Sequence, residues 1–394
     1  MPKTYGKGFL LYFLNNQKFR GIFFQLLTVV AVVAFMWYIA SNVSHNIEQR
    51  GIVTGLGFLH HVAGFGIDES PIAYSSSSST YFDVFLVGLL NTLIVSVVGI
   101  IISSVLGLII GIARLSHNFI ISKLALLYVE IFRNIPLLLQ ILFWYNVVLA
   151  ALPSPRASLH PIKGIFINNR GLYFPDPVFS SHMIYVFLAF LLAIVGVYFL
   201  KKWAKKRFEE EGKEFALVPV SIAIIIIVPL LVFLLDTKAV HFDYPSLHGF
   251  NFSGGDVLYP EFLALVLALS IFTATYIAEA VRSAIEAIPK GQKEAAQSLG
   301  LSKYQVLSII ILPQAIKIAI PPIINLYLNV VKNSSLATAI GYPEIVTVFA
   351  GTVLNQTGQA IEIITITMLV YLFLSLIISL ILNFINKKIQ IKER

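Results

Sequence analysis

The chain has 394 residues, of which 57% are apolar and 12% charged, and its formal net charge is +8. Because soluble domains carry about 25% charged residues, this composition excludes an ordinary soluble protein and indicates a membrane protein. The sequence contains no cysteine, which excludes disulfide bonds and thiolate metal sites.

Runs of about 18 or more apolar residues predict membrane-spanning helices. In chain order, these runs cover residues 22–40, 84–113, 124–152, 183–200, 215–235, 262–281, 315–331 and 361–385. They predict an all-α integral membrane protein with about eight transmembrane helices. The first run has about 20 apolar residues, longer than a usual signal core, so we expect a retained span rather than a cleaved secretory signal.

Two prolines, Pro321 and Pro322, interrupt the seventh run. A proline inside a helix removes a backbone donor and crowds the preceding turn. This span is therefore either kinked or begins only after the two prolines, and the sequence leaves both possibilities open.

The distribution of lysine and arginine predicts the orientation of the chain. With an inside N-terminus, 21 of the 28 basic residues fall in inside segments, 6 in outside segments, and Arg133 within a span. Because cytoplasmic loops carry an excess of Lys and Arg, we expect both termini to face the cytoplasm. The outside loop that follows residue 152 has five prolines between residues 153 and 177, and we expect it to be irregular and partly ordered.

Charged and polar residues in the spans are candidates for a polar route across the membrane. Glu130 and Arg133, and again Glu279 and Arg282, repeat the pattern Glu-x-x-Arg, whose charged members share one helix face and can pair. The candidate pathway residues are Glu130, Arg133, Glu279, Asn325, Asn329 and Lys332. The sequence leaves open whether these charges line a pathway or pair only to hold helices together.

A compact polar element, residues 294–313, interrupts the apolar pattern between the sixth and seventh spans. Ala295 and Ala296 predict a helix that a partner can approach closely, and Gly300 is suited to the left-handed conformation that ends a helix. Ser302 and Gln305 have the spacing of a capping box, which predicts a second short helix that Pro313 ends. We expect a helix, a sharp turn and another helix that together form a docking surface.

The sequence lacks the motifs and residue spacings that are typical of catalytic sites. It contains no glycine-rich phosphate loop of the form G-x-x-x-x-G-K-[ST], so it has no recognisable means of hydrolysing a nucleotide itself. The eight histidines show no metal-ligand spacing, and no serine, histidine and aspartate are placed for catalysis. We expect a protein without catalytic residues, metal or bound cofactor.

The order E-A-A, three residues, G, nine residues, I, one residue and L-P is met throughout residues 294–313. It resembles the cytoplasmic loop of permease subunits in ATP-binding-cassette (ABC) importers. The resemblance implies coupling helices that contact an ATP-hydrolysing subunit. The implied contact positions are Glu294, Ala295, Ala296, Gly300 and Leu301.

Further segments, residues 88–116, 128–140 and 325–344, resemble the polar amino acid branch of this family, and residues 351–362 are similar to the Q-type subunits of general L-amino acid transporters. The resemblance implies a five-helix type I permease core, here with a preceding first helix and an inserted helix pair at 183–235. The implied parts are 1–83 with the first span and an outside loop, a transmembrane domain at 84–385, and a cytoplasmic tail at 386–394. Asn329 differs from the glutamate of many relatives.

The resemblance implies the permease subunit of an ATP-driven L-amino acid importer in a bacterial inner membrane. Its implied partners are ABC ATPase subunits that bind the ATP, a second related permease subunit, an outside amino-acid-binding protein and membrane lipid, without nucleic acid. Two alternatives remain: a secondary transporter driven by an ion gradient, and a scaffold that only anchors a cytoplasmic partner.

Overall fold

The computed structural model describes residues 17–50, 54–212, 215–236, 238 and 240–389. Its α-helices are α2 (Gln17–Arg50), α3 (Tyr81–Arg114), α4 (Phe119–Asn134), α5 (Leu137–Phe143), α6 (Met183–Glu211), α7 (Leu217–Leu235), α8 (Pro260–Glu286), α9 (Lys290–Ser298), α10 (Lys303–Gln305), α11 (Leu312–Asn333), α12 (Leu354–Thr357) and α13 (Ala360–Ile389). Short 3-10 helices are η1 (Gly57–His60), η3 (Pro155–Ala157) and η5 (Ser334–Ile340), and π-helical segments are η2 (Trp144–Leu149), η4 (Val306–Ile311) and η6 (Val346–Val353). The strands are β1 (Phe166–Asn168), β2 (Gly171–Phe174), β3 (Asp176–Phe179), β4 (Val240–Asp243), β5 (Ser246–His248), β6 (Asn251–Ser253) and β7 (Asp256–Leu258).

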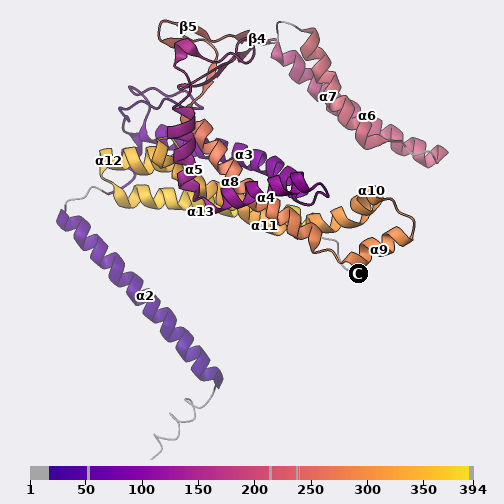
Figure 1. Ribbon diagram of the computed structural model, residues 1–394. Helices are drawn as coiled ribbons and strands as arrows, with labels where there is room; N and C mark the ends of the chain where they lie inside the picture. Colours follow the sequence, from indigo (N-terminus) through magenta and orange to yellow (C-terminus); the bar gives the residue numbers. More distant parts are fainter. Residues whose placement is uncertain (1–16, 51–53, 213–214, 237, 239, 390–394) are drawn as a thin grey trace, which may run out of the picture.

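The predicted set of about eight spans is confirmed. Among the described residues, seven helices are long and apolar enough to cross a membrane, and a bent pair of helices makes up to eight. The chain is therefore a multi-pass membrane protein made mainly of helices (Figure 1).

The third predicted span is not one helix. α4 and the segment 137–149 meet at an angle of 100°. The break falls at Ile135, which is extended because Pro136 disfavours a helical conformation at the residue before it. The amide of buried Gln140 donates to the carbonyl oxygens of Phe132 and Ile135 at 2.8 and 2.9 Å, and so satisfies backbone groups that the break leaves without helical partners.

Prolines do not end the helix where the sequence suggested. α11 begins at Leu312 and passes through Pro321 and Pro322, so the seventh span begins before them. The prediction that Pro313 ends the second short helix is wrong, because one helical segment runs from Lys303 to Ile340. The π-helical segment η4 lies directly before Pro313, and its wider turn accommodates a residue without a backbone donor.

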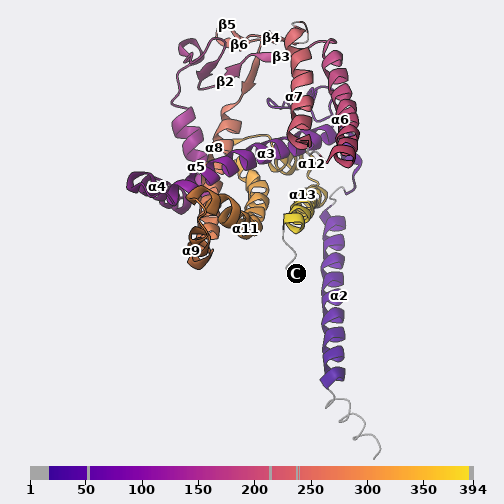
Figure 2. The same cartoon turned by 90° about the vertical axis from the view of Figure 1, so that its right-hand side faces the viewer.

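The loop at 153–182, expected to be irregular and partly ordered, contains β1, β2 and β3, and the loop at 236–259 contains β4, β5, β6 and β7. β1, β2 and β7 form an antiparallel sheet, in which Tyr173 pairs with Phe166 on one side and with Val257 on the other. β3 pairs with β4, and β5 with β6. These strands gather at the end of the bundle opposite α9 (Figure 2). We call it the strand-bearing end.

The centre of the bundle is the contact between α3 and α8. A Cβ atom added at Gly107 would lie 2.6 Å from Ile277 Cβ, and one at Gly111 would lie 2.9 Å from the carbonyl oxygen of Ala278. Glycines four residues apart therefore let the two backbones approach closely, as small residues do between membrane helices. Buried apolar residues of α5 and η5 complete this core.

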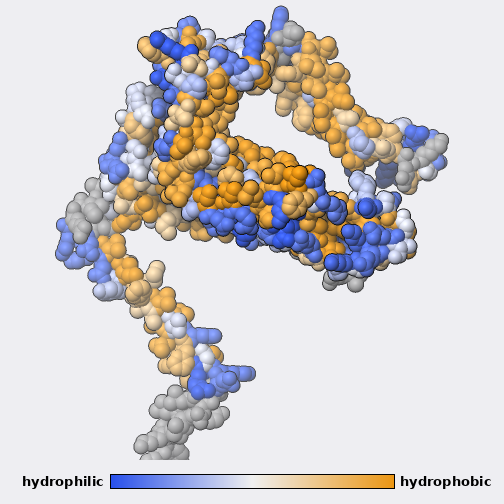
Figure 3. Space-filling view, viewed as in Figure 1, coloured by the Kyte–Doolittle hydropathy of each residue, from blue (hydrophilic) through white to orange (hydrophobic). Residues whose placement is uncertain are grey.

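Some helices bury little of their surface within the described part of the chain. The most apolar stretches of α2 and α7 are 0% buried, and those of α6 and α13 are 11% buried. α6 and α7 run side by side and point away from the bundle, as α2 does (Figure 1). Their surfaces are largely apolar (Figure 3), as expected for helices that face lipid.

Candidate coupling element and polar face

The predicted helix, turn and helix are present at the end of the bundle opposite the strands. The backbone N–H of Gly300 donates to Gln297 at 2.9 Å, and that of Leu301 donates to Ala296 at 3.2 Å. This pair of bonds, with Gly300 at φ +81°, is a Schellman motif that ends α9. We call residues 290–313 the coupling element.

The second helix begins with the predicted capping box. The Ser302 hydroxyl accepts from the N–H of Gln305 at 3.3 Å, and the Gln305 amide oxygen accepts from the N–H of Ser302 at 2.9 Å. Gln314 in α11 also donates to Gln292 in α9 at 2.6 Å, which ties the first helix of the element to the start of α11.

Replacing Ser302 by alanine is expected to loosen the start of the second helix by about 1 kcal/mol, because the N–H of Gln305 loses its partner. The measurement is hydrogen exchange at that amide, which should become about fivefold faster. Ser308→Ala is the control, since its hydroxyl donates to the carbonyl oxygens of Tyr304 and Gln305 within the same helical segment. An unchanged exchange rate in Ser302→Ala would show that the cap does not hold this turn.

The predicted contact residues differ in their exposure to solvent. Glu294, Ala295 and Gly300 are exposed, Leu301 is half-buried, and Ala296 is buried inside the element. Two exposed residues beside them were not predicted: Leu299 is 84% exposed and Tyr304 is 77% exposed. Apolar side chains on either side of the glycine turn were the sequence signal that could have identified them.

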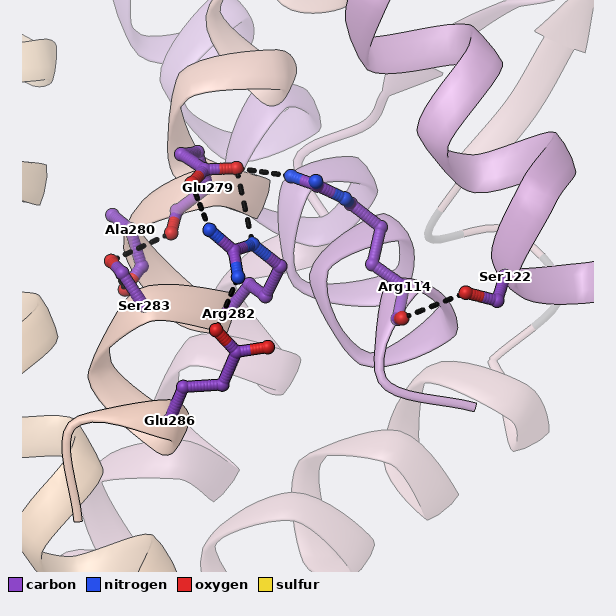
Figure 4. A network of polar contacts seen from close by, with 7 residues as sticks. All are labelled: Arg114, Ser122, Glu279, Ala280, Arg282, Ser283 and Glu286. Carbon is purple, nitrogen blue, oxygen red and sulfur yellow. Dashed lines mark hydrogen bonds and ion pairs between the residues drawn. The ribbon is translucent and has the colours of Figure 1, made fainter. Parts of the chain in front are cut away.

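A network of charges links the ends of α3 and α8 near the coupling element (Figure 4). Glu279 accepts from both Arg114 and Arg282, and Arg282 also pairs with Glu286. The Ser122 hydroxyl donates to the carbonyl oxygen of Arg114 at 3.0 Å and attaches the start of α4. The predicted pairing of Glu279 with Arg282 is present, and Arg114 is a partner that the sequence pattern missed.

The corresponding ion pair in α4, between Glu130 and Arg133, is not formed. The Arg133 guanidinium lies over the Tyr276 ring, 5.2 Å from its centroid, and the Asn134 amide donates to the carbonyl oxygen of Glu130 at 2.7 Å. Within the described residues, Glu130 and Arg133 make no ion pair with each other, and both are exposed. Their charges are therefore not used to neutralise one another inside the chain.

The remaining pathway candidates lie on one face of α11. Asn325, Asn329 and Lys332 are four and three residues apart, so they share a helix face, and all three are exposed. We call them the polar face. A hydrophilic band is visible along the bundle where α4 and α11 lie (Figure 3). Of the six candidates, only Glu279 is joined to another helix by an ion pair in the described part of the chain.

Comparison with known proteins gives the family. Residues 186–391 match the family described as binding-protein-dependent transport system inner membrane component. The chain is 48% identical to the general L-amino acid transport system permease protein AapQ of Rhizobium johnstonii, over 96% of this chain and 94% of that protein. It is 50% identical to the putative amino-acid ABC transporter permease protein YhdX of Escherichia coli K12, over 96% of both.

A more distant relative matches an equally large share of this chain. The glutamate/glutamine/aspartate/asparagine transport system permease protein BztB of Rhodobacter capsulatus is 36% identical over 96% of both chains. The matches therefore include the first helix, the inserted helix pair and the strands, and not only the bundle. This chain belongs to the family of inner membrane components of binding-protein-dependent transport systems, and it is a permease subunit rather than an enzyme.

Proposed function

We propose that this permease subunit serves an ATP-driven importer of L-amino acids, and that its coupling element receives the movement of separate ATPase subunits. The names of AapQ and YhdX, at 48% and 50% identity over almost the whole chain, support amino acids as the substrate class. The observation that carries the coupling role is the geometry of residues 290–313, where two capped helices hold exposed Leu299 and Tyr304 at the end of the bundle.

The element is joined firmly to the helices that would carry the movement. Ala284 near the end of α8 and Ile288 just after it pack against Ala315 and Ala319 in α11, and all four are buried. A displacement of α9 would therefore be transmitted to α8 and α11 together. Nucleotide-driven closure of the ATPases would tilt these helices and alternate access to the pathway.

The coupling element faces the cytoplasm in this proposal, and both termini lie on the same side in a bacterial inner membrane. The basic residues support this orientation, with 21 of 28 on that side. A substrate-binding protein would then deliver its amino acid to the strand-bearing end.

A second permease subunit covers the polar face of α11 in this proposal. Polar side chains that face lipid are costly, and Asn325, Asn329 and Lys332 are exposed within the single chain. A related subunit placed against them would enclose a polar route between the two chains. The arrangement that we propose pairs this chain with a different but related permease chain.

A thiol introduced at Asn329 is expected to capture that subunit. The chain has no cysteine, so Asn329→Cys carries a single thiol to which a photo-crosslinker can be attached. Illumination of the assembled transporter should join this chain to a second permease subunit, identified by mass spectrometry. Ile226→Cys in α7, 57% exposed on a lipid-facing helix, should not capture it. Equal capture at both positions would contradict the proposed interface.

Transport by purified components tests the function as a whole. Proteoliposomes that contain this subunit, its permease partner and the ATPase subunits should take up labelled amino acids only with ATP and the binding protein. Uptake driven by an ion gradient without ATPase subunits would instead support a secondary transporter with Glu130, Glu279 and Lys332 as ion sites.

A further inference from the structure

A cavity of about 750 Å³ lies at the strand-bearing end, where its lining includes Tyr173 of β2 and Pro260 at the start of α8. Its walls come from the loop before α3, the end of the bent pair, the turn between β1 and β2, the start of α8 and the segment around residues 341–352. This cavity is separate from the polar face of α11, since Asn325, Asn329 and Lys332 do not line it.

Charges of both signs line the cavity. Asp68, Glu69 and Glu261 supply carboxylates, and Arg170 supplies a guanidinium group. Within the described residues, Glu69 Oε2 is buried and makes no hydrogen bond. A buried carboxylate oxygen without a partner is costly, and a cationic ligand would remove that cost once the Glu69 side chain turned this oxygen toward the cavity.

The residues on both sides of the cavity are held in place. The amide of buried Asn91 donates to the carbonyl oxygens of Glu69 and Pro343, at 2.9 and 3.0 Å, and so fixes two walls to α3. Arg170 donates to the carbonyl oxygen of Phe250 at 3.2 Å and to the side chain of Asn251, both around the β5–β6 hairpin. Acidic and basic residues of the cavity lining are thus held in place by contacts within the chain.

We infer that this cavity binds a free α-amino acid as a zwitterion, with its ammonium group at Glu69 and its carboxylate at Arg170. The inference rests on the proposed function, because the amino acid would be one received from the binding protein. The cavity would act as an entry site, occupied before the solute passes between the helices. Tyr145 and Glu261 both line the cavity, and the Tyr145 hydroxyl donates to Glu261 at 2.7 Å, which holds that second carboxylate in place.

The ionisation of Glu69 gives the site a pH dependence. Burial, with smaller contributions from Glu261 and Asp256, raises the pKa of Glu69 to about 8. The other ionisable groups that face the cavity are Asp68, Tyr145, Arg170, Tyr173 and Tyr259. An ammonium group binds the ionised carboxylate, so affinity should rise as the pH rises from 6 to 8. Glu69→Gln should remove this dependence.

The test uses the transporter purified with all its subunits and without binding protein. Labelled glutamate, glutamine, arginine and leucine are the probes, and equilibrium binding is measured at pH 8 without nucleotide. Glu69→Gln is expected to weaken binding about tenfold, because a charged hydrogen bond to the ammonium group is lost. Asp176→Asn is the matched control, since Asp176 lies in β3 at the same end but does not line the cavity. The same preparations are assayed for ATP-driven uptake.

The outcomes separate the two proposals. Binding that Glu69→Gln weakens and Asp176→Asn leaves unchanged would support the entry site, as would the failure of the matching 2-hydroxy acids to compete. The inference is overturned if wild-type transporter takes up amino acids with ATP but binds none of the four probes, or if Glu69→Gln binds them as tightly as wild type. It is also overturned if a chelator of divalent cations abolishes binding. Absence of ATP-driven uptake in wild type would instead refute the proposed function.

Discussion

Leu299→Asp is expected to release the ATPase subunits and to reduce ATP-driven uptake to background, while the permease itself remains folded. Leu299 is 84% exposed at the tip of the coupling element, and burial of a leucine against a partner contributes about 2 kcal/mol. Aspartate removes that contribution and adds a charge whose desolvation opposes docking. The measurements are co-purification of the ATPase subunits and uptake by proteoliposomes.

Two matched variants make the result interpretable. Leu299→Met keeps an apolar side chain of similar size and should keep both ATPase binding and uptake. Ile162→Asp introduces the same charge at a residue that is 66% exposed at the strand-bearing end, and it should leave ATPase binding unchanged. If Leu299→Asp retains the ATPase subunits and normal uptake, the coupling element is not the docking surface.

Glu279→Ala is expected to be the most destabilising of the single substitutions considered. It removes the carboxylate between Arg114 and Arg282, and leaves Arg114, whose side chain is 13% exposed, without its ion-pair partner. Loss of one partner of a fully buried pair costs about 3–5 kcal/mol. Because the Glu279 side chain is 29% exposed, we expect about 2 kcal/mol here. Thermal unfolding of the purified subunit measures the loss.

A double variant distinguishes a structural role from a role in transport. Arg114→Leu combined with Glu279→Leu removes both charges that link α3 to α8, and it should recover most of the lost stability. Recovery of uptake together with stability would assign the pair to holding the helices. Recovery of stability without uptake would place Glu279 in the pathway. Glu209→Ala, which breaks an exposed pair with Lys205, should cost less than about 0.5 kcal/mol.

Local chemistry made the coupling element predictable from sequence. The turn at Gly300 and the cap at Ser302 depend on residues within five positions of each other, so their spacing already specifies the hydrogen bonds. Apolar length predicted the spans for a similar reason, because each helix satisfies its own backbone groups inside a membrane. The exposure of Leu299 depends on the placement of α9 against η4, which spacing alone does not give.

Features that depend on distant segments were missed. β2 pairs with β7 across the inserted helix pair, and short strands of three or four residues leave too few alternating positions for a pattern. Arg114 lies 165 positions from Glu279, so the pattern Glu-x-x-Arg pointed only to the partner on the same helix. The helix break at Ile135 was visible as a proline at 136, but apolar length outweighed it in the prediction of one span.

The close seam between α3 and α8 has a mechanical consequence. Gly107 and Gly111 lie against α8, and Arg114 pairs with Glu279. The two helices are therefore tightly packed and should move as one rigid body. α8 alone has 27 residues and is therefore about 40 Å long. Glu261, next to the first residue of α8, lines the cavity, and the last residue of α8 lies a few positions before the start of α9. In the proposed transport cycle, a movement of α9 would thus reach the strand-bearing end directly through α8, and solute entry would be timed by ATP hydrolysis on the ATPase subunits.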